Sequence, residues 1–292
     1  MYILFFKGER YLCRRIYVYL QVKNFSDMKN RILVFVMLAA VVTCLSSCCR
    51  KSSPSDFRAM VEPTRGVDGV QIHVPMAADA PVALWDDELT LGLAHVASVD
   101  GEGLYTIVRD DSAATKGMVR MVYPASAIAG LGSVVIDTVQ QSQPMGAGMV
   151  LYGESTADAP GEVALKVVSG IVRLDLFTPE RLSTVALCTA DSNRYMAGVF
   201  EVGNYPFPVL NATSQSTHGV LLTGLEEVDF SQHGDAICYV APGCYHTLAV
   251  VMTTPDGRVC TKNLKEGKEV VVDRNGMVTI HLGNETNTLV FE

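Results

Sequence analysis

Short alternating strands separated by turn residues fill almost the whole chain after residue 67, and they constrain its fold most strongly. Apolar and polar residues alternate along 70–74 (VQIHV), 118–123 (MVRMVY) and 171–176 (IVRLDL), so that apolar side chains share one face of a strand. Turn sequences such as 100–103 (DGEG) and 255–257 (PDG) recur at roughly 8–12-residue spacing. Helical periodicity is nearly absent, which excludes doubly wound α/β folds and their nucleotide sites. The sequence predicts an all-β fold built from β-sandwiches.

The best internal boundary is 157–161 (ADAPG), which separates two series of expected strands. About 245 residues follow residue 47, enough for two domains of ordinary size. We therefore expect an N-terminal β-sandwich domain over residues 67–159 and a C-terminal one over residues 160–292.

The chain carries a signal for lipid attachment near its N-terminus. A basic segment at 28–31 (MKNR) precedes an apolar run at 32–45 and the small residues before Cys48. This order is typical of a bacterial lipoprotein signal peptide. We expect cleavage after residue 47, acylation of Cys48 by chains such as palmitate, and anchoring in the outer membrane. An ordinary transmembrane anchor is the alternative, although the run is shorter than the ~20 residues that a bilayer span needs.

Two further segments flank this signal. Residues 1–27 are aromatic and basic, and we interpret them as an extension outside the true start at Met28, or else as a second membrane-associated helix. Residues 48–66 are rich in Ser, Pro, Arg and Gly, a composition that predicts an extended tether.

The part of the chain after residue 47 is acidic. Seven of the 23 Lys and Arg residues and two of the 31 Asp and Glu residues precede residue 48, which leaves 16 and 29 and a net charge near −13. Sequence-independent binding of nucleic acid needs clustered basic residues, so this class of function is excluded.

Cysteine and acidic residues give no metal, cofactor or catalytic site. An odd number of cysteines follows Cys48, so no disulfide framework is indicated. A zinc site was considered for four neighbouring residues, but none has CxxC spacing and buried thiols are favoured: Cys238, Cys244, His246 and Cys260. The acids at 86–88 beside Trp85 suggest glycosidase chemistry, yet adjacent strand residues face opposite ways and a solvated turn is favoured. The sequence predicts that the protein is not an enzyme.

Several segments resemble, in their order, the fimbrillin-like lipoprotein family of Bacteroides and relatives, the subunits of type V pili. They are 123–126 (YPAS), 151–155 (LYGES), 197–202 (AGVFEV), 238–245 (CYVAPGCY) and 273–277 (DRNGM). The resemblance covers roughly residues 118–283 and the lipid-attachment signal. It implies two tandem transthyretin-like β-sandwich domains with Greek-key antiparallel sheets, and few or no helices apart from the signal segment. It also implies a structural subunit of surface fimbriae, exported as a lipoprotein and assembled with other subunits by strand exchange after N-terminal trimming.

The resemblance further implies a trimming site and a donor strand. Members are cut by a trypsin-like protease, and Arg50, Arg58 and Arg65 are the candidate positions, with Arg65 preferred. The tail 284–292 is the candidate donor strand, because Leu289 and Phe291 fall on one face of an extended segment. The alternative, that this tail is the final strand of its own sandwich, is equally favoured.

A different function is also open. The protein could be a membrane-anchored adhesive or carbohydrate-binding lipoprotein that does not polymerise and whose partners are host or bacterial surface glycans. Exposed aromatic residues would then bind the ligand, and the candidates are Tyr205, Phe207, Tyr239 and Tyr245, although packing inside a sandwich is favoured for most of them.

Overall fold

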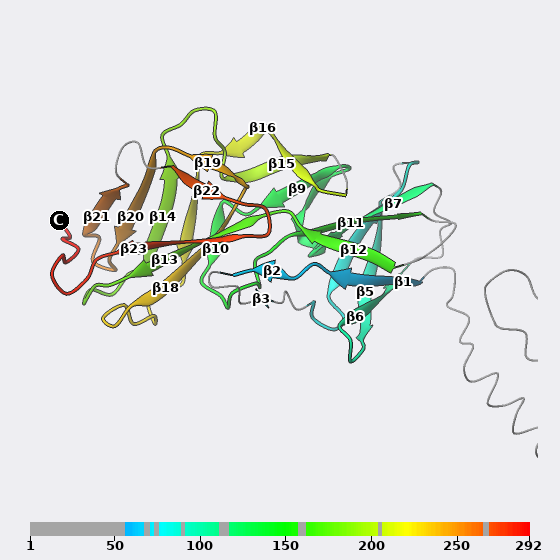
Figure 1. Cartoon of the computed structure of the whole chain (residues 1–292), viewed down its shortest axis with the longest axis horizontal. Coiled ribbons are helices and arrows are strands. Elements are labelled where there is room, and N and C mark those ends of the chain that lie inside the picture. Colours follow the sequence, from blue (N-terminus) through cyan, green and yellow to red (C-terminus); the bar gives the residue numbers. More distant parts are fainter. Residues whose placement is uncertain are drawn as a thin grey trace, which may run out of the picture. The chain divides into compact units, whose positions relative to one another are not determined.

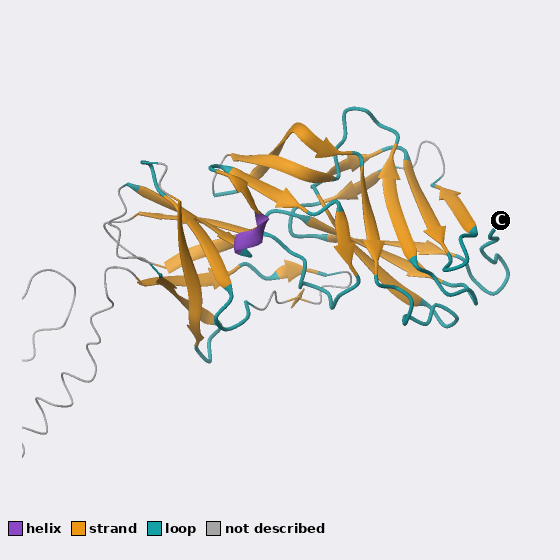
Figure 2. Cartoon of the chain, turned by 180° about the vertical axis from the view of Figure 1, so that it is seen from behind, coloured by secondary structure: helices purple, strands orange, loops and turns teal. Residues whose placement is uncertain are grey.

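The computed structural model describes residues 56–66, 71–72, 76–88, 91–110, 117–156, 162–203, 206–264 and 269–292. The chain divides into two compact units, residues 1–52 and 53–292, and every described residue belongs to the second. Apart from one 3-10 turn at Ala125–Ala127, the regular structure of these residues consists of strands (Figure 2). The predicted all-β class is confirmed. Within the described residues no helix is long and apolar enough to span a bilayer.

The first body is a closed barrel of seven strands, in the order β1-β12-β11-β7-β4-β5-β6. Strand β1 closes it, pairing in parallel with β12 and antiparallel with β6. Side chains such as Leu84, Ile107 and Met121 are buried in its core. The strand bounds are β1 Asp56–Val61, β4 Pro81–Trp85, β5 Leu91–Val99, β6 Leu104–Arg109, β7 Met118–Tyr123, β11 Leu151–Thr156 and β12 Glu162–Val167.

The second body contains a five-stranded sheet (β10-β17-β14-β20-β21), a three-stranded sheet (β18-β13-β23), a four-stranded sheet (β16-β15-β9-β8) and the pair β19-β22. One core joins them, with Leu187, Phe200 and Phe230 among its buried side chains. The bounds are β8 Ile128–Gly130, β9 Ser133–Ile136, β10 Val139–Gln141, β13 Gly170–Leu176, β14 Thr184–Thr189, β15 Ala197–Gly203, β16 Val209–Thr217, β17 Gly219–Thr223, β18 Gly234–Val240, β19 Gly243–Tyr245, β20 Leu248–Thr253, β21 Val259–Asn263, β22 Val270–Val272 and β23 Met277–Leu282. A further short pair joins β2 (Thr64–Arg65) to β3 (Gln71–Ile72).

The burial of β13 follows the alternation of its sequence. Val172, Leu174 and Leu176 are buried, whereas Arg173 and Asp175 point outward. Arg173 forms an ion pair with Asp235 on the neighbouring strand β18. Period two in the sequence therefore fixes which face of this strand enters the core.

Strand pairing crosses the expected boundary between residues 159 and 160. Strand β12, which follows this boundary, completes the barrel, while β9 and β10, which precede it, pair with β15 and β17 of the second body. Strand β1 lies within residues 48–66, the expected tether. Alternation determines the buried face of a strand but not its partner, so these long-range pairings have no local sequence signal.

Candidate functional site

Strand β1 fills a slot between β6 and β12 in the barrel wall (Figure 1). Phe57 and Ala59 are 2% and 0% exposed and point into the barrel core, whereas Arg58 and Met60 point out. Because β1 alone joins β6 to β12, its removal would open the barrel and expose both its core and two strand edges.

The segment that follows β1 is held by the turn between β22 and β23. The Arg274 guanidinium donates to both carboxylate oxygens of Glu62, at 2.6 and 3.1 Å, and to the Val167 carbonyl at 2.8 Å. Asn275 donates through its side chain to the Pro63 carbonyl at 2.9 Å, and its own carbonyl accepts from the Arg65 amide at 3.1 Å. Residues 62–65 are therefore fixed in an extended course by contacts with the second body.

The charge of Arg274 alters the titration of its partner. Partial burial raises the pKa of Glu62, but the hydrogen bonds and the positive charge of Arg274 outweigh this effect and hold that pKa below its ordinary value of 4.5. The pair is largely shielded from solvent, with side-chain exposures of 20% and 21%.

The predicted trimming residues have different surroundings. Arg58 is exposed but lies in the middle of β1, with backbone partners on both sides and its guanidinium 3.7 Å from the Asp100 carboxylate. Arg65 is exposed in the two-residue strand β2, just after the strand that closes the barrel. Arg50 and the lipidation residue Cys48 lie outside the described residues.

The C-terminal tail packs against its own body. Leu289 is buried and Phe291 is half-buried against the core of the second body, while Val290 between them is 63% exposed. The backbone amide of Glu292 donates to the Val259 carbonyl at 3.1 Å, and the Val259 amide donates to the Glu292 carbonyl at 2.9 Å. The tail thus lies beside β21, as Figure 1 shows, with the two predicted donor residues on one face.

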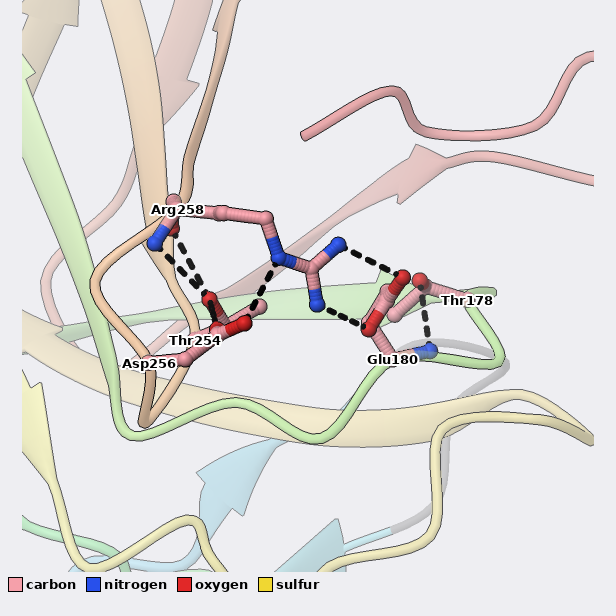
Figure 3. Close-up of polar contacts among 5 residues, drawn as sticks. All are labelled: Thr178, Glu180, Thr254, Asp256 and Arg258. Carbon is pink, nitrogen blue, oxygen red and sulfur yellow. Dashed lines mark hydrogen bonds and ion pairs between the residues drawn. The ribbon is translucent and has the colours of Figure 1, made fainter. Parts of the chain in front are cut away.

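A polar cluster fixes the hairpin turn next to this tail (Figure 3). Arg258 donates to both carboxylate oxygens of Glu180, at 2.9 and 2.8 Å, and to Asp256 at 2.9 Å. The Thr254 hydroxyl accepts from the Arg258 amide at 3.0 Å. In the loop after β13, the Thr178 hydroxyl accepts from the Glu180 amide at 3.2 Å. The hydrogen bonds and charge of Arg258 hold the pKa of Glu180 below its ordinary value. The cluster ties the β20–β21 turn to the loop after β13, directly before Val259.

Two of the four aromatic candidates for glycan binding, Tyr239 and Tyr245, are buried, as sandwich packing predicts. The Tyr239 hydroxyl accepts from the Gly146 amide at 2.8 Å, and the Tyr245 hydroxyl donates to the Ala241 carbonyl at 2.5 Å. Burial raises the pKa of both phenols. Phe207 is 65% exposed, and Tyr205 lies outside the described residues.

A polar cleft of about 270 Å³ lies where β9, β10 and the loop before β11 meet. Amide side chains of Gln140, Gln141 and Gln143, together with Asp137, contribute to its lining. Gln140 is engaged in structure, because its side chain donates to the Tyr239 carbonyl at 2.7 Å and accepts from the Tyr239 amide at 2.9 Å.

The acidic turn proposed for glycosidase chemistry is occupied by structural contacts. Asp87 accepts from the Arg120 guanidinium at 2.9 Å and from the Met118 amide at 2.8 Å. Asp86 is buried and accepts from the Glu88 amide at 3.0 Å.

The four residues considered for zinc do not form one site. Cys238 and Cys260 lie in the buried core, as expected for structural thiols, and burial raises the pKa of Cys238 to about 12. Cys244 and His246 lie near the surface beside Glu269, a residue that the sequence analysis did not single out.

Comparisons with known proteins give matches among solved structures alone. No protein-family model matches the chain, and no curated protein matches it. Several solved structures do. The matches include fimbrial and candidate cell adhesion proteins.

Three of these matches illustrate the likeness. A candidate cell adhesion protein from Bacteroides fragilis is 9% identical, with 81% of this chain and 97% of that chain covered and a TM-score of 0.43. A fimbrial assembly protein from Parabacteroides distasonis is 11% identical, with coverage of 81% and 93% and a TM-score of 0.38. The fimbrial anchor protein of Porphyromonas gingivalis is also 11% identical, with coverage of 81% and 94% and a TM-score of 0.37.

These matches belong to the same bacterial group that the sequence resemblance indicates. At such identities and TM-scores, the likeness alone establishes neither a shared fold nor a shared function. The geometry of β1 and the tail therefore has to support any functional conclusion.

Proposed function

We propose that this chain is a structural subunit of surface fimbriae, exported as a lipoprotein through Cys48 and assembled by strand exchange after N-terminal trimming. One observation carries the proposal: the strand that closes the barrel, β1, ends at Val61, and the exposed Arg65 follows within the next turn-length segment of chain. A cut after Arg65 separates β1 and the lipid-bearing segment from the rest of the chain.

Loss of β1 creates an acceptor groove. The backbone groups of β6 and β12 that pair with β1 become free, and the places of Phe57 and Ala59 in the barrel core become empty. An extended strand from another subunit restores both, because main-chain hydrogen bonds supply affinity and alternate side chains fill the vacated positions. The incoming strand must run parallel to β12 and antiparallel to β6, as β1 does.

The side-chain pattern of the C-terminal tail supports its role as a donor strand. Leu289 and Phe291 are two residues apart, like Phe57 and Ala59 in β1, so both pairs place two apolar side chains on one face of a strand. Donation requires the tail to leave its place beside Val259.

The proposal includes the architecture that the resemblance implies, two diverged transthyretin-like sandwiches with Greek-key sheets. Strand pairing in the barrel supports it, because the six strands in the order β12-β11-β7-β4-β5-β6 are joined by antiparallel pairs throughout, as the sheets of such a sandwich are. Comparing experimental structures of the uncut and trimmed proteins tests this part. A trimmed protein that keeps a closed barrel contradicts it.

Trimming followed by electron microscopy tests the assembly route. The full chain is treated with a trypsin-like protease under native conditions, the new N-terminus is sequenced, and filaments are counted. For wild type and for Arg58→Gln, we expect a new N-terminus at residue 66 and filaments. For Arg65→Gln, we expect neither this N-terminus nor filaments. Filaments from uncut protein, or a trimmed protein that stays monomeric, contradict the proposal.

The second candidate function, a glycan-binding lipoprotein that does not polymerise, is favoured by the amide-lined cleft near Gln141 and Gln143. A glycan array probed with the full chain tests it. Binding that is lost in Gln143→Ala, together with an absence of filaments after trimming, supports this function over the fimbrial one.

A further inference from the structure

The outer face of the strand pair β19–β22 brings three metal-ligating side chains together. Cys244 of β19 is opposite Val271 of β22, and Tyr245 is opposite Val270. Continuing this antiparallel register by one residue places His246 opposite Glu269. The three side chains therefore meet across the end of a short strand pair, although 23 residues of sequence separate His246 from Glu269.

The alternation of burial shows that these side chains share the solvent side. Tyr245 and Val272 are 1% and 2% exposed and face the core, so their neighbours in each strand point outward. Accordingly Cys244 is half-buried, His246 and Glu269 are exposed, and Val271 is 53% exposed. A pair of ligands two residues apart on one strand, Cys-x-His, thus points to the same surface as the glutamate.

The distances suit a small divalent ion. The Cys244 Sγ and His246 Nε2 atoms are 3.6 Å apart. With Zn–S near 2.3 Å and Zn–N near 2.05 Å, a tetrahedral ion separates these two atoms by about 3.5 Å. One ligand atom from each of the three residues lies within 4.8 Å of the other two.

The glutamate is already directed at the thiol. The Cys244 thiol donates to Oε1 of Glu269. Binding of an ion at this position displaces the thiol proton to solvent. The Glu269 side chain is exposed, so it is free to adjust to the ligand separations of a tetrahedral site.

We propose that Cys244, His246 and Glu269 bind one Zn²⁺ ion through a thiolate, an imidazole and a carboxylate, with water in the fourth position. Thiolate and imidazole select zinc over the hard cations Ca²⁺ and Mg²⁺, which prefer oxygen ligands. The bound ion cross-links β19 to β22 at the surface and is independent of the fimbrial proposal, since β1, Arg65 and the tail do not contribute to it.

A zinc titration of the full chain, purified in detergent, reduced and free of any polyhistidine tag, tests the site. Zn²⁺ is added in competition with a chromophoric chelator, and Co²⁺ is used in parallel to detect thiolate-to-metal charge-transfer absorption. We expect wild type to bind one equivalent of Zn²⁺. Cys244→Ser and His246→Gln should each lower the zinc affinity by about 100-fold, since even outer partners of metal ligands contribute about 10- to 100-fold. Glu269→Gln should lower the affinity by about 10-fold.

Cys188→Ser is the matched control, because Cys188 is also a half-buried free thiol but belongs to β14. This variant should keep the full affinity and the cobalt absorption. The ligand variants change surface residues, so their thermal unfolding in chelator should match wild type, and only wild type and Cys188→Ser should gain stability on addition of zinc. Equal zinc affinity in wild type and Cys244→Ser, or no zinc-dependent shift in the unfolding temperature of wild type, overturns the proposal.

Discussion

Arg274 is the residue through which the segment after β1 is attached to both bodies. Its guanidinium bonds Glu62 on one side and the Val167 carbonyl at the end of β12 on the other. Replacement by Gln leaves a largely shielded carboxylate without its charge partner. Arg274 therefore shares with Asn275 the task of holding residues 62–65 next to the proposed cut.

We predict that Arg274→Gln lowers the free energy of unfolding by about 1–3 kcal/mol, the range for losing hydrogen bonds to a shielded charged group. It should also speed proteolysis after Arg65. Denaturant unfolding and a time course of cleavage measure the two effects. Arg58→Gln is the control, because its ion pair with Asp100 is exposed and long, so little change in stability is expected. Equal cleavage rates in Arg274→Gln and wild type contradict the prediction.

The same ion pair predicts a pH dependence. The pKa of Glu62 is lowered in the folded protein, so its contribution to stability is fully present above its ordinary value of 4.5 and is lost as pH falls through the lower folded value. Other carboxylates with lowered pKa values, such as Asp175, add to the same loss in both proteins. The free energy of unfolding is measured from about pH 6 to about pH 3. It should fall less steeply for Arg274→Gln than for wild type. Parallel curves contradict the role of Glu62.

At the scale of elements, the proposal treats strand β1 as a separable part of the barrel. Both backbone edges of β1 are paired, and it gives the barrel core Phe57, Ala59 and the partly buried Val61. A short peptide can reproduce both features.

We predict that a peptide of residues 56–61, added to protein trimmed after Arg65, occupies the groove and blocks filament growth. The physical reason is that it restores the backbone pairing with β6 and β12 and refills the core. A control peptide with Asp in place of Phe57 should have no effect, because a buried unpaired carboxylate is costly. Light scattering and electron microscopy measure growth, and equal inhibition by the two peptides contradicts the prediction.

Elements also show how far the sequence could predict this structure. The alternation in β13 gave its buried face correctly, because that information is local. The pairing of β10 with β17, and of β1 with β12, joins residues far apart in sequence, and alternation does not encode it. Tyr239 and Tyr245 were candidates for glycan binding only if exposed, and core packing and hydroxyl partners bury both. The Cys-x-His pair was visible, but Glu269 is brought to it only by strand pairing.

For the whole molecule, the proposed assembly makes one subunit both donor, through its tail, and acceptor, through the slot of β1. The slot belongs to the barrel and the tail to the second body, beside β21. Head-to-tail contacts generate open filaments wherever the rotation between neighbouring subunits does not close a ring. The two ends of such a filament then differ. The subunit at one end has an unfilled β1 slot, and the subunit at the other end has a tail that no neighbour has accepted.

We predict that deletion of residues 286–292 abolishes filament formation by trimmed protein, because the subunit loses its donor strand while its groove stays intact. Such a variant still accepts a wild-type tail, so small amounts mixed with trimmed wild type should shorten the filaments. Leu289→Asp should act like the deletion, whereas Val290→Asp should assemble normally, since Val290 is 63% exposed and points away from the core. Filament lengths in electron micrographs measure these effects. If the deletion variant polymerises, the donor role is contradicted and the tail is only the last segment of its own body. The contacts of Leu289 and Glu292 would then be structural, and the deletion should lower the unfolding temperature of the trimmed monomer.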